Sequence, residues 1–285
     1  MTGLRTATGI CLAGFFSIAI LPSPAPSGEL RLDGPLVQGG LVIGKTLPGA
    51  RVAIDGRAAR VSEKGIFLIG FGRDAGPKAT IHIQYPDGGE ARKTVKIKKR
   101  TFKVQRINGL PSRKVTPKPE DLARIKRDNA GIAGVRRLDT PAAGFASGFQ
   151  WPVAGPVSGV FGSQRILNGK PKSPHNGVDV AAPRGTTVTA AAAGTVALTH
   201  PDMFYTGKTV MIDHGHGLSS VYVHMDKILV RKGQRVHKGA PIGVVGKTGR
   251  TTGPHLHWGV SLFNVHLDPA LLAGPMPDSA PRKGG

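Results

Sequence analysis

Cysteine is almost absent from this chain, which has a single one, Cys11, among 285 residues. One cysteine excludes an internal disulfide framework. Aromatic residues are also scarce, at 5%. Acidic residues are few as well, because 17 Asp and Glu face 39 Lys and Arg and leave a formal net charge of +22. Such a surplus implies attraction to a polyanion, although charge alone does not say which one.

Nucleic acid is the first polyanion to consider for so basic a chain. The basic residues are spread over the whole sequence, and no nucleic-acid-binding motif occurs among them. Few aromatic side chains are available to stack on bases. Without a basic cluster, a motif or a stacking platform, we expect no nucleic-acid partner.

Long apolar runs are absent except at residues 7–21, which follow Arg5 and precede a proline-rich segment. This run of about 15 residues is shorter than the ~20 that a membrane-spanning helix needs. The pattern predicts a secretory signal peptide over residues 1–27, with an uncut membrane anchor as the alternative. After cleavage the chain would have neither a membrane span nor Cys11. Histidine and carboxylate side chains would then be its metal ligands.

Residues 28–100 contain short β-branched or alternating runs separated by turns rich in glycine and proline. This spacing is typical of a small β-sandwich, so we expect an Ig-like accessory domain here. The segment has no chemical motif. Its expected role is to space, dock or cover the other domain, and a purely structural role fits equally well. The strand-like runs are residues 41–43, 51–54, 66–69, 79–83 and 94–97.

Residues 101–148 are predicted to form a linker with one helix. Thr116 can cap that helix and Pro117 suits its first turn. Apolar residues such as Leu122 and Ile125 give it a broken apolar stripe. Residues 140–148, rich in alanine and glycine, then read as the connection into the next domain.

Histidine gathers in the second half of the chain, where nine of the 10 lie from His175 onward. His175 and Asp179 are four residues apart, and His255 and His257 are two apart. A catalytic zinc ion takes three protein ligands, and two imidazoles with one carboxylate are an established set. Residues two apart on a strand share one face, so His255 and His257 point the same way. We expect one of them to bind the metal and the other to lie beside the open coordination position.

A further histidine, His224, follows an alternating, strand-like pattern. The sequence His-x-x-x-Asp at 175–179, Tyr-Val-His-Met at 222–225 and Gly-Pro-His-Leu-His at 253–257 resembles the lysostaphin-like (LytM-type) zinc endopeptidases, which cut the peptide stems or bridges of peptidoglycan. The resemblance covers roughly residues 149 to 270. It implies one zinc ion per chain. The metal ligands that it implies are His175, Asp179 and His257, and the catalytic pair is His224 and His255.

Arg165 lies at the end of a stretch, residues 159–165, that in this family leads into the metal site. We expect it to bind a substrate carboxylate, and the alternative is an ordinary surface arginine. His214 and His216 also have the spacing of a metal pair, but a hairpin turn between two strands explains them better. The histidines that fit no ligand role in the family pattern are His200, His214, His216, His237 and His266.

The predicted fold is mainly β. It has a LytM/lysostaphin-like antiparallel peptidase domain over residues 149–274 and a disordered tail over residues 275–285. The predicted function is that of a zinc-dependent endopeptidase acting on peptidoglycan in the periplasm or cell envelope. Anionic envelope polymers are expected as further partners. One alternative is a catalytically inactive LytM-type regulator of wall amidases, against which the intact ligand set argues. The other is a wall-binding module, which would need no metal.

Overall fold

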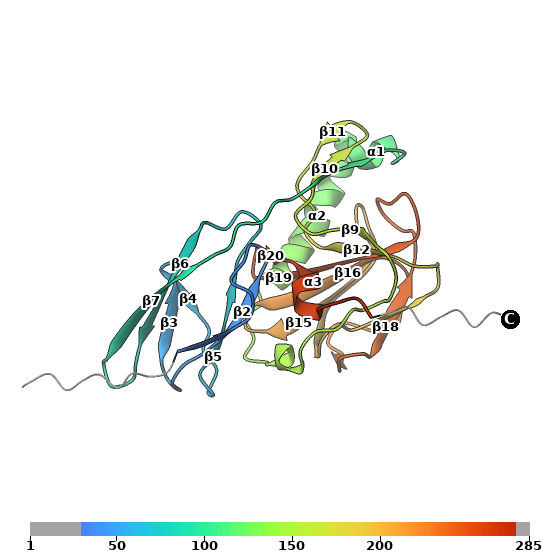
Figure 1. Cartoon of the computed structure of the whole chain (residues 1–285). Coiled ribbons are helices and arrows are strands. Elements are labelled where there is room, and N and C mark those ends of the chain that lie inside the picture. Colours follow the sequence, from blue (N-terminus) through green and yellow to red (C-terminus); the bar gives the residue numbers. More distant parts are fainter. Residues whose placement is uncertain (1–29, 278–285) are drawn as a thin grey trace, which may run out of the picture.

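The computed structural model describes residues 30–277, whose regular structure is mainly antiparallel β-sheet with few helices (Figure 1). The mainly β fold expected from the sequence is confirmed at this level. None of the helices within residues 30–277 combines the length and the apolar character that crossing a membrane requires. The predicted signal peptide, residues 1–27, lies outside the described residues, as does the predicted tail from residue 278 onward.

Two antiparallel sheets form the N-terminal part of the molecule. They share one core, to which Val42 and Phe67 contribute from one sheet and Ile81 and Ile83 from the other. The region predicted to be Ig-like therefore consists of two packed sheets, and its assignment to the Ig class stays a prediction. One sheet has the order β1 (Arg31–Asp33), β2 (Leu41–Lys45), β5 (Ile66–Gly70), and the other β4 (Arg57–Ala59), β3 (Arg51–Ile54), β6 (Lys78–Gln84), β7 (Glu90–Lys96).

A long helix, α2 (Pro119–Arg136), follows the short helix α1 (Ser112–Val115). Its N-cap is Lys118, with Pro119 in the first turn, so the start predicted at Thr116 is wrong by two residues. The carboxylate of Asp121 fixes this start, because it accepts hydrogen bonds from the Lys118 backbone N–H at 3.2 Å and from the Arg113 guanidinium at 2.6 and 2.8 Å.

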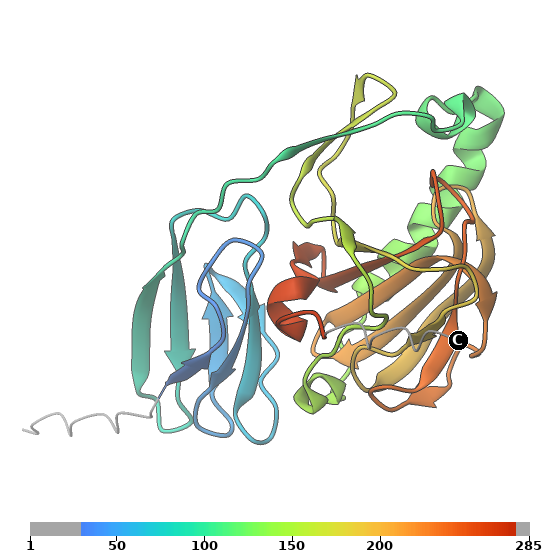
Figure 2. The ribbon, with the colours of Figure 1, turned by 45° about the vertical axis from the view of Figure 1, so that its right-hand side comes forward.

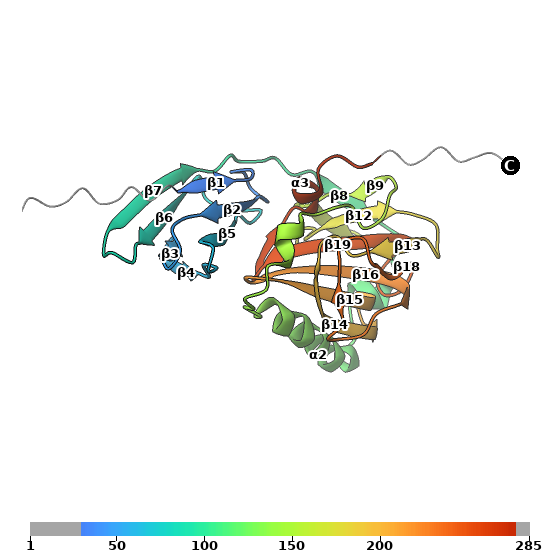
Figure 3. The same cartoon turned by 90° about the horizontal axis from the view of Figure 1, so that it is seen from below.

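The helix α2 packs against the sheet of the C-terminal half (Figure 3). Val135 and Ile132 meet Met211, Val221 and Val223 there in a small apolar cluster. Along the chain, the 3-10 helix η1 (Gly144–Ser147) follows α2 and precedes the first strand of that sheet. The helix is thus held against the sheet by apolar contacts.

The C-terminal half is built on a ten-stranded sheet with the central order β17-β14-β15-β16-β19-β12-β9. One face carries the main core, in which Tyr222 and Trp258 are fully buried. The strands are β9 (Val157–Gly159), β12 (Val178–Ala181), β13 (Thr187–Thr189), β14 (Gly194–Met203), β15 (Gly207–Gly215), β16 (Leu218–Ile228), β17 (Arg235–Val236), β18 (Pro241–Val245), β19 (His255–Leu262) and β20 (Val265–Leu267), and a short helix, α3 (Pro269–Ala273), follows.

A third, small sheet joins segments that are far apart in the sequence. Strand β8 (Val104–Ile107) pairs in parallel with β10 (Gln164–Leu167), which also pairs with β11 (Lys170–Pro171). The register places Gln105 beside Arg165. In Figure 2 the chain leaves the N-terminal sheets, runs past the β10–β11 hairpin and only then enters the helices.

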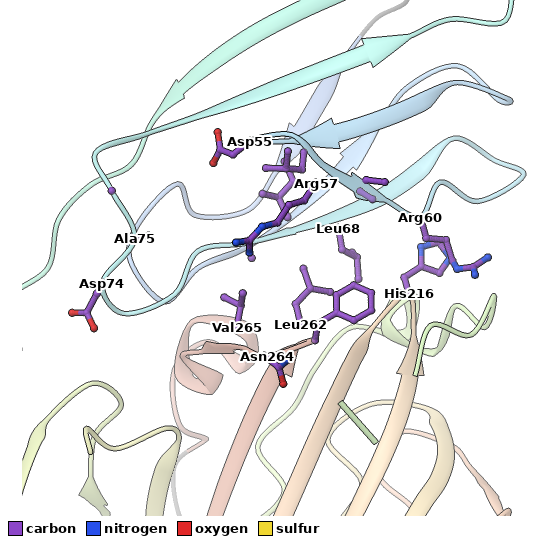
Figure 4. Close-up of a pocket in the computed structure, with 17 residues that line it drawn as sticks. Asp55, Arg57, Arg60, Leu68, Asp74, Ala75, His216, Leu262, Asn264 and Val265 are labelled. Atoms are coloured by element: carbon purple, nitrogen blue, oxygen red, sulfur yellow. The ribbon is translucent and has the colours of Figure 1, made fainter. Parts of the chain in front are cut away.

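The two halves of the molecule meet along β5, β19 and β20. Leu41 and Leu68, from the N-terminal sheets, belong to the main core together with Leu262. The Arg100 guanidinium adds an ion pair to Asp268 at 2.8 Å. A cavity of about 840 Å³ lies between the two halves, lined by residues of β4, β5 and the β19–β20 turn (Figure 4).

Candidate metal centre

Three donor atoms converge where β12 meets β19. Asp179 and His257 lie directly opposite each other in this antiparallel pair, and His175 enters from the loop before β12. The Asp179 Oδ1 atom lies 2.8 Å from His257 Nδ1 and 3.0 Å from His175 Nε2, and the two nitrogens are 2.8 Å apart. The structure therefore brings together the three residues expected to bind the metal, and they form the one group among residues 30–277 that could hold an ion.

Glycine at position 177 lets this loop approach the sheet. A Cβ at Gly177 would collide with the backbone carbonyl of Trp258 and would lie 2.9 Å from the His257 ring. Any larger residue would therefore push His175 away from its two partners.

The protonation of these groups favours a cation between them. Nδ1 of His175 lies 3.1 Å from the Val160 carbonyl oxygen, which can only accept, so this nitrogen carries the proton and Nε2 of the neutral ring keeps a lone pair. The Asp179 oxygen is also an acceptor. His175 Nε2, Asp179 Oδ1 and His257 Nδ1 thus point lone pairs at one another, with at most one proton, on His257 Nδ1, available to them. A metal ion between them would bind all three atoms. Two imidazoles and a carboxylate are the donor set that suits zinc.

The electrostatics of the site keep these groups in their metal-binding forms. Burial raises the pKa of the Asp179 carboxyl, but its contacts with His175 and His257 outweigh burial and hold this pKa well below the usual value. Burial lowers the pKa of His257 to about 4, even though Asp179 opposes the change. At neutral pH the site thus presents an ionised carboxylate and a neutral imidazole.

Arg165 holds the other oxygen of the Asp179 carboxylate. Its Nη2 group donates to Oδ2, which leaves Oδ1 for the two histidines. The Arg165 side chain is 17% exposed. The alternative of an ordinary surface arginine is therefore wrong. Gly159 leaves room for this contact, because a Cβ there would collide with the Asp179 carboxylate. The arginine positions a donor group, and its expected contact with substrate stays a prediction.

His224 and His255 lie next to the three donors, with ring centroids 4.8 Å apart. Nδ1 of His224 donates to the Thr248 carbonyl at 2.8 Å, and Nδ1 of His255 donates to the Gly253 carbonyl at 2.9 Å. Each ring therefore carries a proton on Nδ1 and, in its neutral form, keeps its lone pair on Nε2. Nε2 of His255 is 3.9 Å from Asp179 Oδ1, and His224 and His255 both line a cavity beside Asp179.

A β-bulge turns His224 toward the site. Val210 pairs with Tyr222 and Lys208 with Met225, so two steps on β15 correspond to three steps on β16. Strict alternation would place His224 on the buried face with Tyr222, whereas the extra residue lets Val223 and His224 share the opposite face. His224 adopts a φ of 64°, an uncommon value for a residue other than glycine, which the structure holds at a functional position.

None of the histidines expected to have no ligand role belongs to the converging donor group within residues 30–277. His214 uses both ring nitrogens inside the protein, with Ala193 O at 2.7 Å and Ser220 Oγ at 2.8 Å. His216 packs edge-on against Phe145, with ring centroids 5.1 Å apart. His214 lies near the end of β15 and His216 in the turn that leads into β16, which agrees with the hairpin interpretation.

Acid is expected to destabilise the fold through His214. Burial lowers its pKa in the folded protein from 6.5 to about 4. The contribution of neutral His214 to the free energy of unfolding is complete above pH 6.5 and is lost as the pH falls toward 4. In this range the unfolded chain binds a proton at His214 and the folded chain does not. The loss amounts to ~3 kcal/mol.

The variant His214→Gln tests this expectation, since glutamine can donate and accept at the same site without titrating. Urea unfolding of both proteins at pH 7 and pH 4.5 should show a smaller acid-induced loss for the variant. Equal losses in the two proteins would assign the acid sensitivity to other groups.

This arrangement, a mainly β domain whose two imidazoles and one carboxylate converge beside a second histidine pair, is that of a metal-dependent hydrolase. Residues 173–269 match Peptidase family M23. A crystal structure assigned to peptidase M23 from Pseudomonas aeruginosa superposes with a TM-score of 0.64 and 33% sequence identity, over 84% of this chain and 95% of that one. The chain therefore belongs to peptidase family M23, and the resemblance drawn from the motifs is confirmed.

Relatives with named activities match a little over a third of the chain. Peptidoglycan DD-endopeptidase ShyA from Vibrio cholerae is 43% identical over 113 residues, which are 39% of this chain and 26% of ShyA. DD-carboxypeptidase/endopeptidase Mpg from Neisseria meningitidis is 39% identical over 104 residues, which are 36% of this chain and 24% of Mpg. The match thus spans about a quarter of the length of these relatives.

Proposed function

We propose that this protein is a zinc-dependent endopeptidase that hydrolyses peptide cross-links or stem peptides of bacterial peptidoglycan in the periplasm or cell envelope. The observation that carries the proposal is the convergence of His175 Nε2, Asp179 Oδ1 and His257 Nδ1 within 2.8–3.0 Å of one another. Two more histidines lie beside them with free Nε2 lone pairs. Relatives named peptidoglycan DD-endopeptidases support the choice of substrate.

His175, Asp179 and His257 would hold the zinc ion, and Arg165 would keep the Asp179 carboxylate in its binding orientation. The chemistry that zinc supplies when bound is Lewis acidity toward the scissile carbonyl and the attacking water. The lone pairs on Nε2 of His224 and His255 face the same space. One of them can accept the proton of the attacking water, and the other, once protonated at Nε2, can donate a hydrogen bond to the developing oxyanion.

Purified sacculi provide the direct test of this proposal. Incubation with the protein should release fragments whose masses correspond to cleaved peptide bonds, and a chelator should stop the release. Intact sacculi in the presence of stoichiometric zinc would contradict the proposal. A protein that leaves sacculi intact but stimulates a purified wall amidase would support the inactive-regulator alternative instead.

Binding to sacculi is expected to weaken steeply with added salt. The formal net charge is +22, of which the predicted signal peptide accounts for one positive charge, at Arg5. Exposed cations act on anionic wall polymer through contacts whose range is ~8 Å at physiological ionic strength. Hydrolysis of a short soluble stem peptide should change much less, because the donor groups of the site are buried and poorly screened.

Both quantities can be measured across the same salt series, with binding followed by co-sedimentation and hydrolysis by chromatography. Parallel salt curves would show that the charge serves catalysis or substrate fit. Binding that does not respond to salt would rule out electrostatic docking.

A further inference from the structure

A cavity of about 170 Å³ opens beside the proposed metal ligands. His224, His255 and Asp179 line it, together with Arg165, Arg250 and Gln105. A water molecule occupies about 30 Å³ of liquid, so the cavity can take a group of roughly the size of one amino-acid side chain. Its position places such a group next to the proposed metal ligands and the histidine pair.

Arg250 brings an unneutralised positive charge to this cavity. Its guanidinium lies over the Tyr205 ring, 4.6 Å from the ring centroid, and no Asp or Glu within residues 30–277 forms an ion pair with it. Burial and the nearby Arg165 cation both lower the pKa of Arg250. Two arginines that share a small, half-buried space repel each other, and an anion between them relieves this repulsion.

Arg165 and Gln105 add a hydrogen-bond donor and an acceptor that have no partner within the described part of the chain. The Nη2 group of Arg165 donates a hydrogen bond to Asp179, while its buried Nε–H group has no partner among the described residues. Gln105 donates from Nε2 to the Ser158 carbonyl at 3.0 Å, while its buried Oε1 is unpaired. The two residues are register neighbours on β10 and β8. Both atoms expose less than 1 Å² of surface, so they are enclosed in the wall of the cavity and a ligand does not reach them directly.

We propose that this cavity is a subsite for a carboxylate-bearing residue of the peptide substrate, in which Arg250 binds the carboxylate and Arg165 supplies a second positive charge. The inference rests on the proposed peptidase function. A carboxylate suits the site because the planar guanidinium binds it through two parallel hydrogen bonds. Arg250 has none of the roles assigned above, whereas Arg165 also holds the Asp179 carboxylate. Gln105 lines the cavity from β8, more than sixty residues before the segment that matches the family, residues 173–269.

The test compares soluble cross-linked stem peptides that differ in a single group. In each peptide one carboxylate, either beside the cross-link or at the free C-terminus, is replaced by a carboxamide. The protein is expected to hydrolyse the acid form of one pair with a ~10- to 100-fold higher kcat/KM than its amide, which is the effect of one charge-assisted, bidentate contact. Arg250→Gln should lower kcat/KM for the acid by a similar factor, mainly through KM, and leave the amide nearly unchanged. Arg250→Lys should fall between the two.

Two further variants separate the contributions. Lys247→Gln removes the same charge from an exposed position in the same loop, so it should keep the preference for the acid. Gln105→Leu keeps the size of an enclosed side chain that the ligand does not reach, so it should also keep the preference for the acid. Zinc content, measured by metal analysis, should remain at one ion per chain in every variant.

Equal hydrolysis of every acid and amide pair by the wild-type protein would overturn the subsite and leave the peptidase function intact. A loss for Arg250→Gln that is equal on both peptides would do the same. Calorimetric binding of the acid and amide peptides gives a readout that needs no turnover. A preference for the acid that Arg250→Gln abolishes would support the subsite even if no peptide were cleaved, in which case the proposed function alone would fail.

Discussion

Replacing His257 with alanine is expected to remove the metal ion and the peptidase activity together. His257 Nδ1 lies 2.8 Å from both other donor atoms, so its loss leaves two ligands where a catalytic zinc ion needs three. Loss of residues that merely support a ligand costs ~10- to 100-fold in metal affinity, and loss of the ligand itself should exceed this range. Metal analysis of the purified variant should find far less than one zinc per chain, and hydrolysis of stem peptides should be undetectable.

His237→Ala is the matched control for this variant. His237 is exposed and its ring bonds to the neighbouring Lys238 carbonyl at 2.9 Å, so its loss should change neither zinc content nor activity. Circular dichroism of both variants checks that the sheets are retained. A His257→Ala protein with stoichiometric zinc and full activity would show that the ligand assignment is wrong.

His224→Ala and His255→Ala are expected to keep zinc and lose turnover. Neither side chain belongs to the converging donor group, and each presents its Nε2 lone pair to the space beside it. Removal of a general acid or base lowers kcat by ~100- to 10,000-fold. Steady-state hydrolysis of stem peptides, combined with metal analysis of the same samples, measures both effects.

The conformation of residue 224 calls for a second variant. His224 has a φ of 64°, which strains alanine but not glycine, so His224→Ala alone could act through the fold. His224→Gly removes the imidazole without that strain and should be equally inactive. Should His224→Gly or His255→Ala lose its zinc, the residue concerned would be a ligand and the division of roles proposed here would fail.

The residues of the donor group could be predicted from the sequence because they lie on regular elements. His257 and Asp179 sit on adjacent strands, where a residue's face follows from its parity, and the four-residue step back from Asp179 reaches His175. On β19 the same parity buries Leu256 and Trp258 on one face and places the two histidines on the other. The strands of the N-terminal sheets could likewise be predicted from runs of β-branched residues separated by turns.

The rest of the site depends on local departures from regularity or on distant pairing. The bulge that turns His224 has no mark in the alternating pattern around it. The Arg165 contact with Asp179 follows from the packing of β10 over the sheet, which a local pattern does not specify. Arg250 stands three residues before the Gly-Pro-His-Leu-His motif, and this proximity was its one usable signal. Gln105 has no signal in the sequence, because its place beside Arg165 arises from a parallel pairing across the intervening helix.

The parallel pairing of β8 with β10 limits where a shorter fragment of the protein can begin. Strand β8 covers one edge of β10, and the loop that connects them contains the whole of α2. A fragment produced from residue 149 onward would include the complete donor group but would expose the edge of β10 to solvent. Exposed strand edges recruit strands from other molecules, so such a fragment would tend to self-associate. A fragment in which this edge stays covered therefore has to begin upstream of β8, near residue 101, and it retains α2, which a start at residue 149 would remove.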